Sequence, residues 1–121
     1  MPKDAERTKT TAADLAQREC VPCKKGQKPL KGEALAGLLW GLDGWKCVKE
    51  HHLTREWKFE DFAQALAFVN KVGALAEEQG HHPDLFLKWG LARAEIYTHS
   101  IDGLSENDFV LAAKIDRVKR P

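Results

Sequence analysis

The chain has 121 residues, which is enough for one domain with one modest hydrophobic core. It carries 19 basic and 18 acidic residues, a formal net charge of +1, so no strong overall field recruits nucleic acid or an anionic membrane. No apolar run approaches the roughly 20 residues of a membrane-spanning helix, and residues 1–19 lack the apolar stretch of a signal peptide. We therefore expect a cytoplasmic protein that binds neither nucleic acid nor membrane.

The beginning of the chain differs in composition from the rest. Residues 1–29 are polar and contain few large apolar side chains. Residues 12–19 are compatible with a helical turn or two, after which two prolines and a glycine interrupt regular structure. The sequence predicts a partly ordered extension over residues 1–29, followed by a domain over residues 30–121.

The three cysteines are Cys20, Cys23 and Cys47, an odd and small number that does not fit a secreted disulfide framework. Cys20 and Cys23 have C-x-x-C spacing. A zinc site needs two further ligands, and a thioredoxin-like motif needs a βαβ context; neither is present in the sequence. Two unpaired thiols in a tail are the favoured interpretation, and a zinc or disulfide role stays open.

The domain is expected to begin with a helix and a β-hairpin. Leucines recur at spacings of three and four over residues 30–42, which predicts a helix over this range that is ended by Asp43-Gly44. Residues 45–50 and 53–59 predict two strands, with His51-His52 as the turn between them. A histidine pair in a polar turn is usually solvated, so this pair is left out of the candidate site.

Residues 60–79 carry the strongest helix signal in the chain. Apolar side chains follow a 3.6-residue period at Phe62, Ala65, Leu66, Val69, Val72, Gly73 and Ala76. Gly80 is expected to stop this helix, and Pro83 prevents its resumption. His81 and His82 are therefore expected on a stiff corner directly after the helix C-terminus.

Two further strands are expected over residues 85–89 and 91–99. In the second strand, alternate residues share a face: Ala92, Ala94, Ile96 and Thr98 on one side, and Arg93, Glu95, Tyr97 and His99 on the other. A two-residue turn at Trp89-Gly90 pairs positions whose numbers sum to roughly 179. This register predicts that His81, His82 and His99 meet at one end of the sheet.

A capping motif precedes the last predicted helix. Asp102-Gly103 is expected as a turn, and Ser105 with Asp108 three positions later is a variant of the capping box. The apolar positions of this helix are Phe109, Val110, Ala113, Ile115 and Val118. The element order α-β-β-α-β-β-α predicts an α+β fold, a four-stranded antiparallel sheet with three helices packed on one face.

The three imidazoles, together with the carboxylates of Glu77 and Asp108, admit more than one chemistry. Adjacent residues on extended backbone point to opposite sides, so His81-His82 is poor geometry for one metal ion, and we expect no metal. Proton transfer suits them better, because histidine gives and takes protons near neutral pH. Glu77, one helical turn before His81, is placed to orient an imidazole. Purely structural roles, including capping by Asp108, stay open.

These residues carry a resemblance to a known family. The runs Glu77-x-x-x-His81-His82-Pro83-Asp84, Trp89, Thr98-His99 and Gly103-Leu104-Ser105-Glu106-x-Asp108 resemble the signature of the pterin-4a-carbinolamine dehydratases. Further matches are Leu39, Leu42-x-Gly44-Trp45, Phe59-x-Asp61-Phe62-x-x-Ala65-x-x-Phe68 and Leu111-Ala112-x-x-Ile115-Asp116. The resemblance covers about residues 30–118.

The resemblance implies a reaction and a site. The family dehydrates 4a-hydroxytetrahydropterin to quinonoid dihydropterin, which recycles the tetrahydrobiopterin cofactor of aromatic amino-acid hydroxylases, without a metal or a cofactor of its own. By the family pattern the catalytic residues are His81, His82 and His99. The pattern also implies substrate-binding or supporting roles for Glu77, Gly80, Tyr97, Thr98, Ser100 and Asp108.

The resemblance also implies partners, and it has departures. Family members form homodimers or homotetramers, and some relatives act as transcription cofactors or assembly factors, so a protein-binding module is the alternative function. The chain departs from the pattern at residues 90–94, where alanines replace β-branched residues, and at Asn107, where relatives can have arginine. The extension with Cys20 and Cys23 lies outside the family domain.

Overall fold

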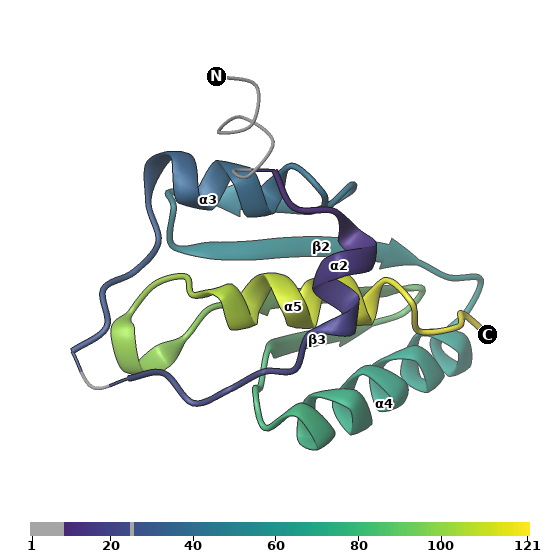
Figure 1. Ribbon diagram of the computed structural model, residues 1–121. Coiled ribbons are helices and arrows are strands. Elements are labelled where there is room, and N and C mark those ends of the chain that lie inside the picture. The colour runs from purple at the N-terminus through teal and green to yellow at the C-terminus, as the bar shows by residue number, and fades with distance from the viewer. Residues whose placement is uncertain (1–8, 25) are drawn as a thin grey trace.

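The computed structural model describes residues 9–24 and 26–121 (Figure 1). A four-stranded antiparallel sheet has the strand order β1-β2-β4-β3. The elements are α2 (Ala12–Gln17), α3 (Gly32–Leu39), β1 (Lys46–Val48), β2 (His52–Lys58), α4 (Phe62–Gln79), β3 (Asp84–Lys88), β4 (Leu91–Ile96), the 3-10 helix η1 (His99–Ile101) and α5 (Glu106–Ile115). The predicted α+β class and element order are confirmed, with the short α2 added in front. Among the described residues no helix is long and apolar enough to cross a bilayer.

The hairpin of β3 and β4 has the predicted register. Asp84 lies opposite Glu95 and Lys88 opposite Leu91, with a two-residue turn in which Gly90 has a φ of 68°. The expectation that β4 runs to His99 is wrong: the strand ends at Ile96, which is the last position paired with β2. Beyond it Thr98 pairs with Gly103 in an isolated bridge, and the chain between them forms η1.

The first hairpin turns two residues earlier than expected. Lys49 and Glu50 both have positive φ, 52° and 53°, and the His51 amide donates to the Val48 carbonyl. Two successive residues in the left-handed region give the turn whose twist matches that of the flanking strands. His52 is therefore the first residue of β2, and the prediction of a turn at His51-His52 is corrected.

Helix α4 ends at the predicted residue, and Ala65, Val72 and Ala76 of the expected apolar stripe are buried. The Asp61 side chain caps its first turn by accepting from the Gln64 amide at 2.8 Å, and Gly80 ends it in the left-handed conformation. Phe62 and Leu66, expected on the buried face, are 40% and 38% exposed. The buried side chains are Ala65, Phe68, Val72 and Ala76, because Phe68 packs against the rings of Trp57 and Phe59 from β2 and its end.

The chain at residues 9–24 packs onto the rest of the fold. A Cβ on Gly41 would lie 2.3 Å from the Thr10 carbonyl oxygen, so this glycine is required where the two segments cross. This crossing accompanies the early end of α3 at Leu39, three residues before the predicted end. The helix expected within residues 12–19 is present as α2, and its Leu15 is fully buried.

Helix α5 is covered on both sides. Phe109, Val110, Ala113 and Ile115 are buried as expected, and so are Leu111 and Ala112 on the opposite side. Val118, also expected in this helix, lies after its end and is partly buried. The sheet covers one face and α2 packs across the other, as Figure 1 shows. Residues 9–24 thus contribute to the same core as the sheet, and the domain boundary expected after residue 29 stays a prediction.

Candidate active site

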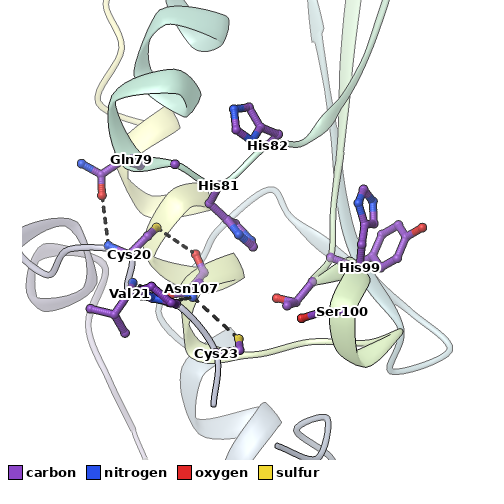
Figure 2. Close-up of a pocket in the computed structure, with 13 residues that line it drawn as sticks. Cys20, Val21, Cys23, Gln79, His81, His82, His99, Ser100 and Asn107 are labelled. Atoms are coloured by element: carbon purple, nitrogen blue, oxygen red, sulfur yellow. Dashed lines mark hydrogen bonds between the residues drawn. The ribbon is translucent and has the colours of Figure 1, made fainter. Parts of the chain in front are cut away.

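A pocket of about 400 Å³ lies where three segments of the chain meet (Figure 2). The corner after α4 contributes residues 79–82, and the chain from β4 into η1 contributes residues 97–100. Residues 20–23 form a further wall, and Asn107 of α5 lies behind it. The pocket therefore gathers His81, His82 and His99, as the hairpin register predicts, although His99 reaches it from η1.

The His81 imidazole is held by a fully buried carboxylate. Its Nε2 lies 2.6 Å from Oδ1 of Asp108, which is 0% exposed. The other carboxylate oxygen, Oδ2, accepts from the Ser105 amide and from the Thr98 hydroxyl, both at 2.8 Å. Asp108 completes the predicted capping box, and the same carboxylate contacts His81. With three contacts converging on it, the carboxylate has no freedom to turn away from the imidazole.

This contact determines the proton positions on His81. A carboxylate only accepts hydrogen bonds, so Nε2 of His81 carries the proton that lies between them. The Nδ1 atom makes no hydrogen bond with any of the described residues. In Figure 2 the ring points toward the space bordered by Cys23 and Ser100. Nδ1 is therefore the nitrogen that remains for a bound molecule, as a base when His81 is neutral and as an acid when it is protonated.

His82 has a different environment from its neighbour. Its Nε2 lies 2.8 Å from Oε2 of Glu77, and the two side chains are 60% and 79% exposed. The structure thus pairs Glu77 with His82, whereas the sequence places it one turn before His81. Figure 2 shows the His82 ring pointing away from the His81 ring, as expected for adjacent residues on extended backbone. An exposed ion pair of this kind contributes little to stability.

His99 and Tyr97 form the opposite side of the pocket. Their rings make an edge contact with centroids 4.3 Å apart, and His99 is exposed. The His51 ring also packs on Tyr97, with ring centroids 4.5 Å apart, and its Nε2 lies 2.9 Å from an Asp102 carboxylate oxygen. His51 does not line the pocket, so its exclusion from the site residues agrees with the geometry.

Sequence reasoning missed the wall formed by residues 20–23. The cysteines are free thiols, and the described residues include no cluster of three or more metal-ligating side chains. Burial raises the pKa of the Cys20 thiol from 9.0 to about 11, while the Lys114 ammonium opposes the shift. Cys20 is therefore a protonated thiol near neutral pH. The sequence feature that marks this wall is the C-x-x-C spacing of Cys20 and Cys23, and that spacing does not predict contacts with α5.

The arrangement suits proton transfer. A pocket with one imidazole oriented by a buried carboxylate and two more at its rim provides groups that donate and accept protons near neutral pH. The backbone of the Gly80 corner and the chain at residues 97–100 enclose this chemistry on two sides.

Known proteins with similar sequences share one description. The family model "Pterin 4 alpha carbinolamine dehydratase" matches residues 28–118. A protein of Rubrobacter xylanophilus named "Putative pterin-4-alpha-carbinolamine dehydratase" is 58% identical over 106 residues, covering 88% of this chain and 99% of its own length. One of the same name from Alkaliphilus metalliredigens is 47% identical over 105 residues, covering 86% of this chain and 95% of its own. Both matches are longer than residues 28–121, so they include part of the N-terminal segment.

Two solved structures have similar folds. The "transcriptional coactivator/pterin dehydratase" of Brucella melitensis has a TM-score of 0.68 and 32% identity, over 74% of this chain and 96% of its own. A "pterin dehydratase-like protein" described as a RuBisCO assembly factor in the alpha-carboxysome has a TM-score of 0.51 and 25% identity, over 60% of this chain and 86% of its own. The family match spans the sheet, α4 and α5 together with the three histidines of the pocket. The chain belongs to the pterin-4-alpha-carbinolamine dehydratase family.

Proposed function

We propose that this protein is a 4a-hydroxytetrahydrobiopterin dehydratase, a hydro-lyase that acts in the cytoplasm without a metal or cofactor. It converts 4a-hydroxytetrahydropterin to quinonoid dihydropterin and water, and so recycles the pterin used by aromatic amino-acid hydroxylases. Membership of the family supports this proposal in general terms. The single observation that carries the histidine chemistry is the 2.6 Å contact between His81 Nε2 and the buried Asp108 carboxylate.

The reaction needs two proton movements. The C4a–O bond breaks, and the oxygen leaves as water once an acid has protonated it. Loss of the proton on N5 then forms the C4a=N5 double bond. We assign the acid and base roles to His81 and His99, because both line the pocket and each imidazole can donate or accept. Each such transfer typically contributes about 10²–10⁴-fold.

The other pocket residues support these two. Asp108 is assigned to fix the His81 ring so that Nδ1 faces the substrate. Thr98 is 6% exposed and donates its hydroxyl to Asp108, so we assign it a positioning role. His82 is assigned to orient the pterin ring, with Glu77 restraining His82.

The remaining assignments concern the pocket edge. Gly80, Tyr97 and Ser100 border the pocket, and we assign them to substrate contact through backbone, ring and hydroxyl groups. Self-association as a homodimer or homotetramer is supported by β3, an edge strand whose Phe86 is 42% exposed.

Protein binding is the second candidate function. The two solved relatives support it, since one is titled a transcriptional coactivator/pterin dehydratase and the other a RuBisCO assembly factor. A protein-binding function does not explain why a buried carboxylate orients the His81 imidazole toward the pocket.

A stopped-flow assay with synthetic 4a-hydroxytetrahydropterin, in buffer containing EDTA, tests the proposal. We expect the wild-type protein to accelerate water loss above the spontaneous rate at catalytic amounts. An unchanged rate, together with a stable protein partner in a pull-down, would favour the protein-binding alternative.

A further inference from the structure

One wall of the pocket comes from outside the region that the family model matches. Residues 20–23 border the pocket together with His81 and His99, whereas the family match begins at residue 28. Figure 2 shows this segment on one side of the pocket and the His99–Ser100 backbone on the other. The site of this chain is therefore bounded by a segment that precedes the region matched by the family model.

The wall is fixed by the side-chain amide of Asn107. Its Oδ1 accepts from the Val21 amide at 2.9 Å, and its Nδ2 donates to the Val21 carbonyl. Both halves of one amide thus pair with the backbone of one residue, as a neighbouring strand would. Asn107 is 7% exposed and directly precedes Asp108 on α5. The residue that holds the wall and the residue that holds His81 are consecutive.

A second tie joins the wall to the corner after α4. The Cys20 amide donates to Oε1 of Gln79 at 3.1 Å, and the Cys20 thiol donates to the Asn107 carbonyl at 3.6 Å. The Cys23 sulfur accepts from Nδ2 of Asn107 at 3.9 Å. Gln79 is the last residue of α4, so the wall spans from α5 to the corner that carries His81.

The wall is held by hydrogen bonds to its backbone and to its two sulfur atoms. Val21 at its centre is 62% exposed, and no residue from 20 to 23 carries a charged side chain. The surface that it offers is made of thiol, valine, proline and peptide groups. A substrate part lying against it must therefore be uncharged, because an ionised group there would lose water without gaining a counter-charge.

The chemistry of the substrate indicates which part this is. If C4a and N5 of the pterin react at His81, the next ring atom is C6, which is bonded to N5 and carries the variable substituent. The first atom of that substituent is bonded to C6 and lies two bonds from N5. The wall is anchored beside Asp108, the partner of His81, so it lies at the same edge of the pocket.

We propose that residues 20–23 contact the C6 substituent of the pterin and determine selectivity for an uncharged side chain, with Asn107 as the positioning residue. This inference rests on the proposed dehydratase function. The dihydroxypropyl group of biopterin fits the required chemistry, since it is uncharged and offers hydroxyls to a surface of peptide groups.

Substrate selectivity provides the first test. We compare two pterin substrates, one with the dihydroxypropyl group at C6 and one with a methyl group there. We expect Asn107→Ala to raise KM about tenfold for the first and less than about twofold for the second, with kcat little changed. A tenfold rise in KM corresponds to the loss of one or two contacts. Asn107→Asp, which keeps the acceptor for the Val21 amide, should be intermediate. Gln79→Ala weakens the same wall if Asn107→Ala does not fold, and the exposed neighbour Glu78→Ala is the matched control.

Thiol protection provides the second test. Alkylation by iodoacetamide is followed at each cysteine by mass spectrometry, with biopterin as the probe ligand. We expect bound biopterin to slow alkylation of Cys23 and to leave Cys47, in β1 outside the pocket, unchanged. Asn107→Ala should speed alkylation of Cys20, whose burial and raised pKa protect it in the wild type.

The outcomes separate this inference from the proposed function. Absence of both turnover and biopterin binding in the wild type would overturn the dehydratase function, and the wall proposal with it. Wild-type turnover, combined with equal KM changes for both substrates and no protection of Cys23, would overturn the wall proposal alone.

Discussion

The chain contains two adjacent histidine pairs, and the structure treats them differently. His51-His52 leads from a hairpin turn into β2, where the two Nδ1 atoms lie 3.1 Å apart. His51 also contacts Asp102, whose side chain is 87% exposed. His81-His82 follows the left-handed Gly80, and there His81 contacts a carboxylate with 0% exposure.

The two pairs differ in how deeply the carboxylate that contacts the histidine is buried. A carboxylate open to water is screened and mobile, so its contact with an imidazole is weak. A buried carboxylate that already accepts two other hydrogen bonds is fixed, and it fixes the imidazole with it. Within the second pair the same contrast recurs, because His82 has only the exposed Glu77. His81 is therefore the residue on which the account depends most.

Replacing His81 by Ala should have the largest effect. It removes the one imidazole held by a buried carboxylate, and we expect turnover to fall by about 10²–10⁴-fold. Stopped-flow rates and the affinity for biopterin are measured together. Affinity close to wild type would place the loss in the chemical step, and wild-type turnover would remove His81 from the mechanism.

Asp108→Asn should come next. The amide either points its NH₂ group at the protonated Nε2 of His81, or turns it toward the Ser105 and Thr98 donors. Either way a donor faces a donor, so we expect turnover to fall by about 10²-fold. The weakened cap should lower the free energy of unfolding by about 1 kcal/mol. Activity and a denaturant titration measure the two effects separately. Unchanged activity with lowered stability would assign Asp108 to capping alone.

His82→Ala should affect substrate binding more than the chemical step. The His82 ring and the Glu77 side chain are exposed, so we expect KM to rise about threefold to tenfold with kcat within about threefold. Glu77→Gln, which removes only the charge, should change either constant by less than about twofold. Steady-state kinetics on both variants provide the check. A kcat loss as large as that of His81→Ala would show that the two histidines share the proton transfer.

The double variant His51→Ala, His52→Ala should have the smallest effect. The pair lies outside the pocket, so we expect turnover within about twofold of wild type. Loss of the His51–Asp102 contact should cost at most about 1 kcal/mol of stability, since Asp102 is exposed. A large fall in activity would show that His51 acts on the site through Tyr97, on which it packs.

Local signals predicted much of this site. The two-residue turn at Gly90 determined the hairpin register, Gly80 determined the helix end, and Ser105 with Asp108 determined the start of α5. Each depends on a residue type whose backbone or hydrogen-bonding preference is strong. The first hairpin lacked such a signal, because Lys49 and Glu50 rarely adopt positive φ, and its turn was misplaced.

Contacts between residues far apart in the sequence could not be predicted from local patterns. Asn107 meets Val21 across 86 positions of sequence, and neither periodicity nor composition reports a contact of that kind. The choice of Phe68 over Phe62 and Leu66 for the inner face of α4 likewise depends on aromatic rings from β2 and its end. The resemblance to a family covered the histidines but stopped short of the N-terminal wall.

Chemical rescue tests the central claim most directly. In His81→Gly the backbone and Asp108 are retained and only the imidazole is removed. We expect single-turnover dehydration of 4a-hydroxytetrahydropterin to be lost in this variant and to return as imidazole is added, while the same addition leaves wild type unchanged. Wild-type dehydration by His81→Gly without imidazole, or a lost rate that imidazole does not raise although biopterin still binds, would contradict the claim.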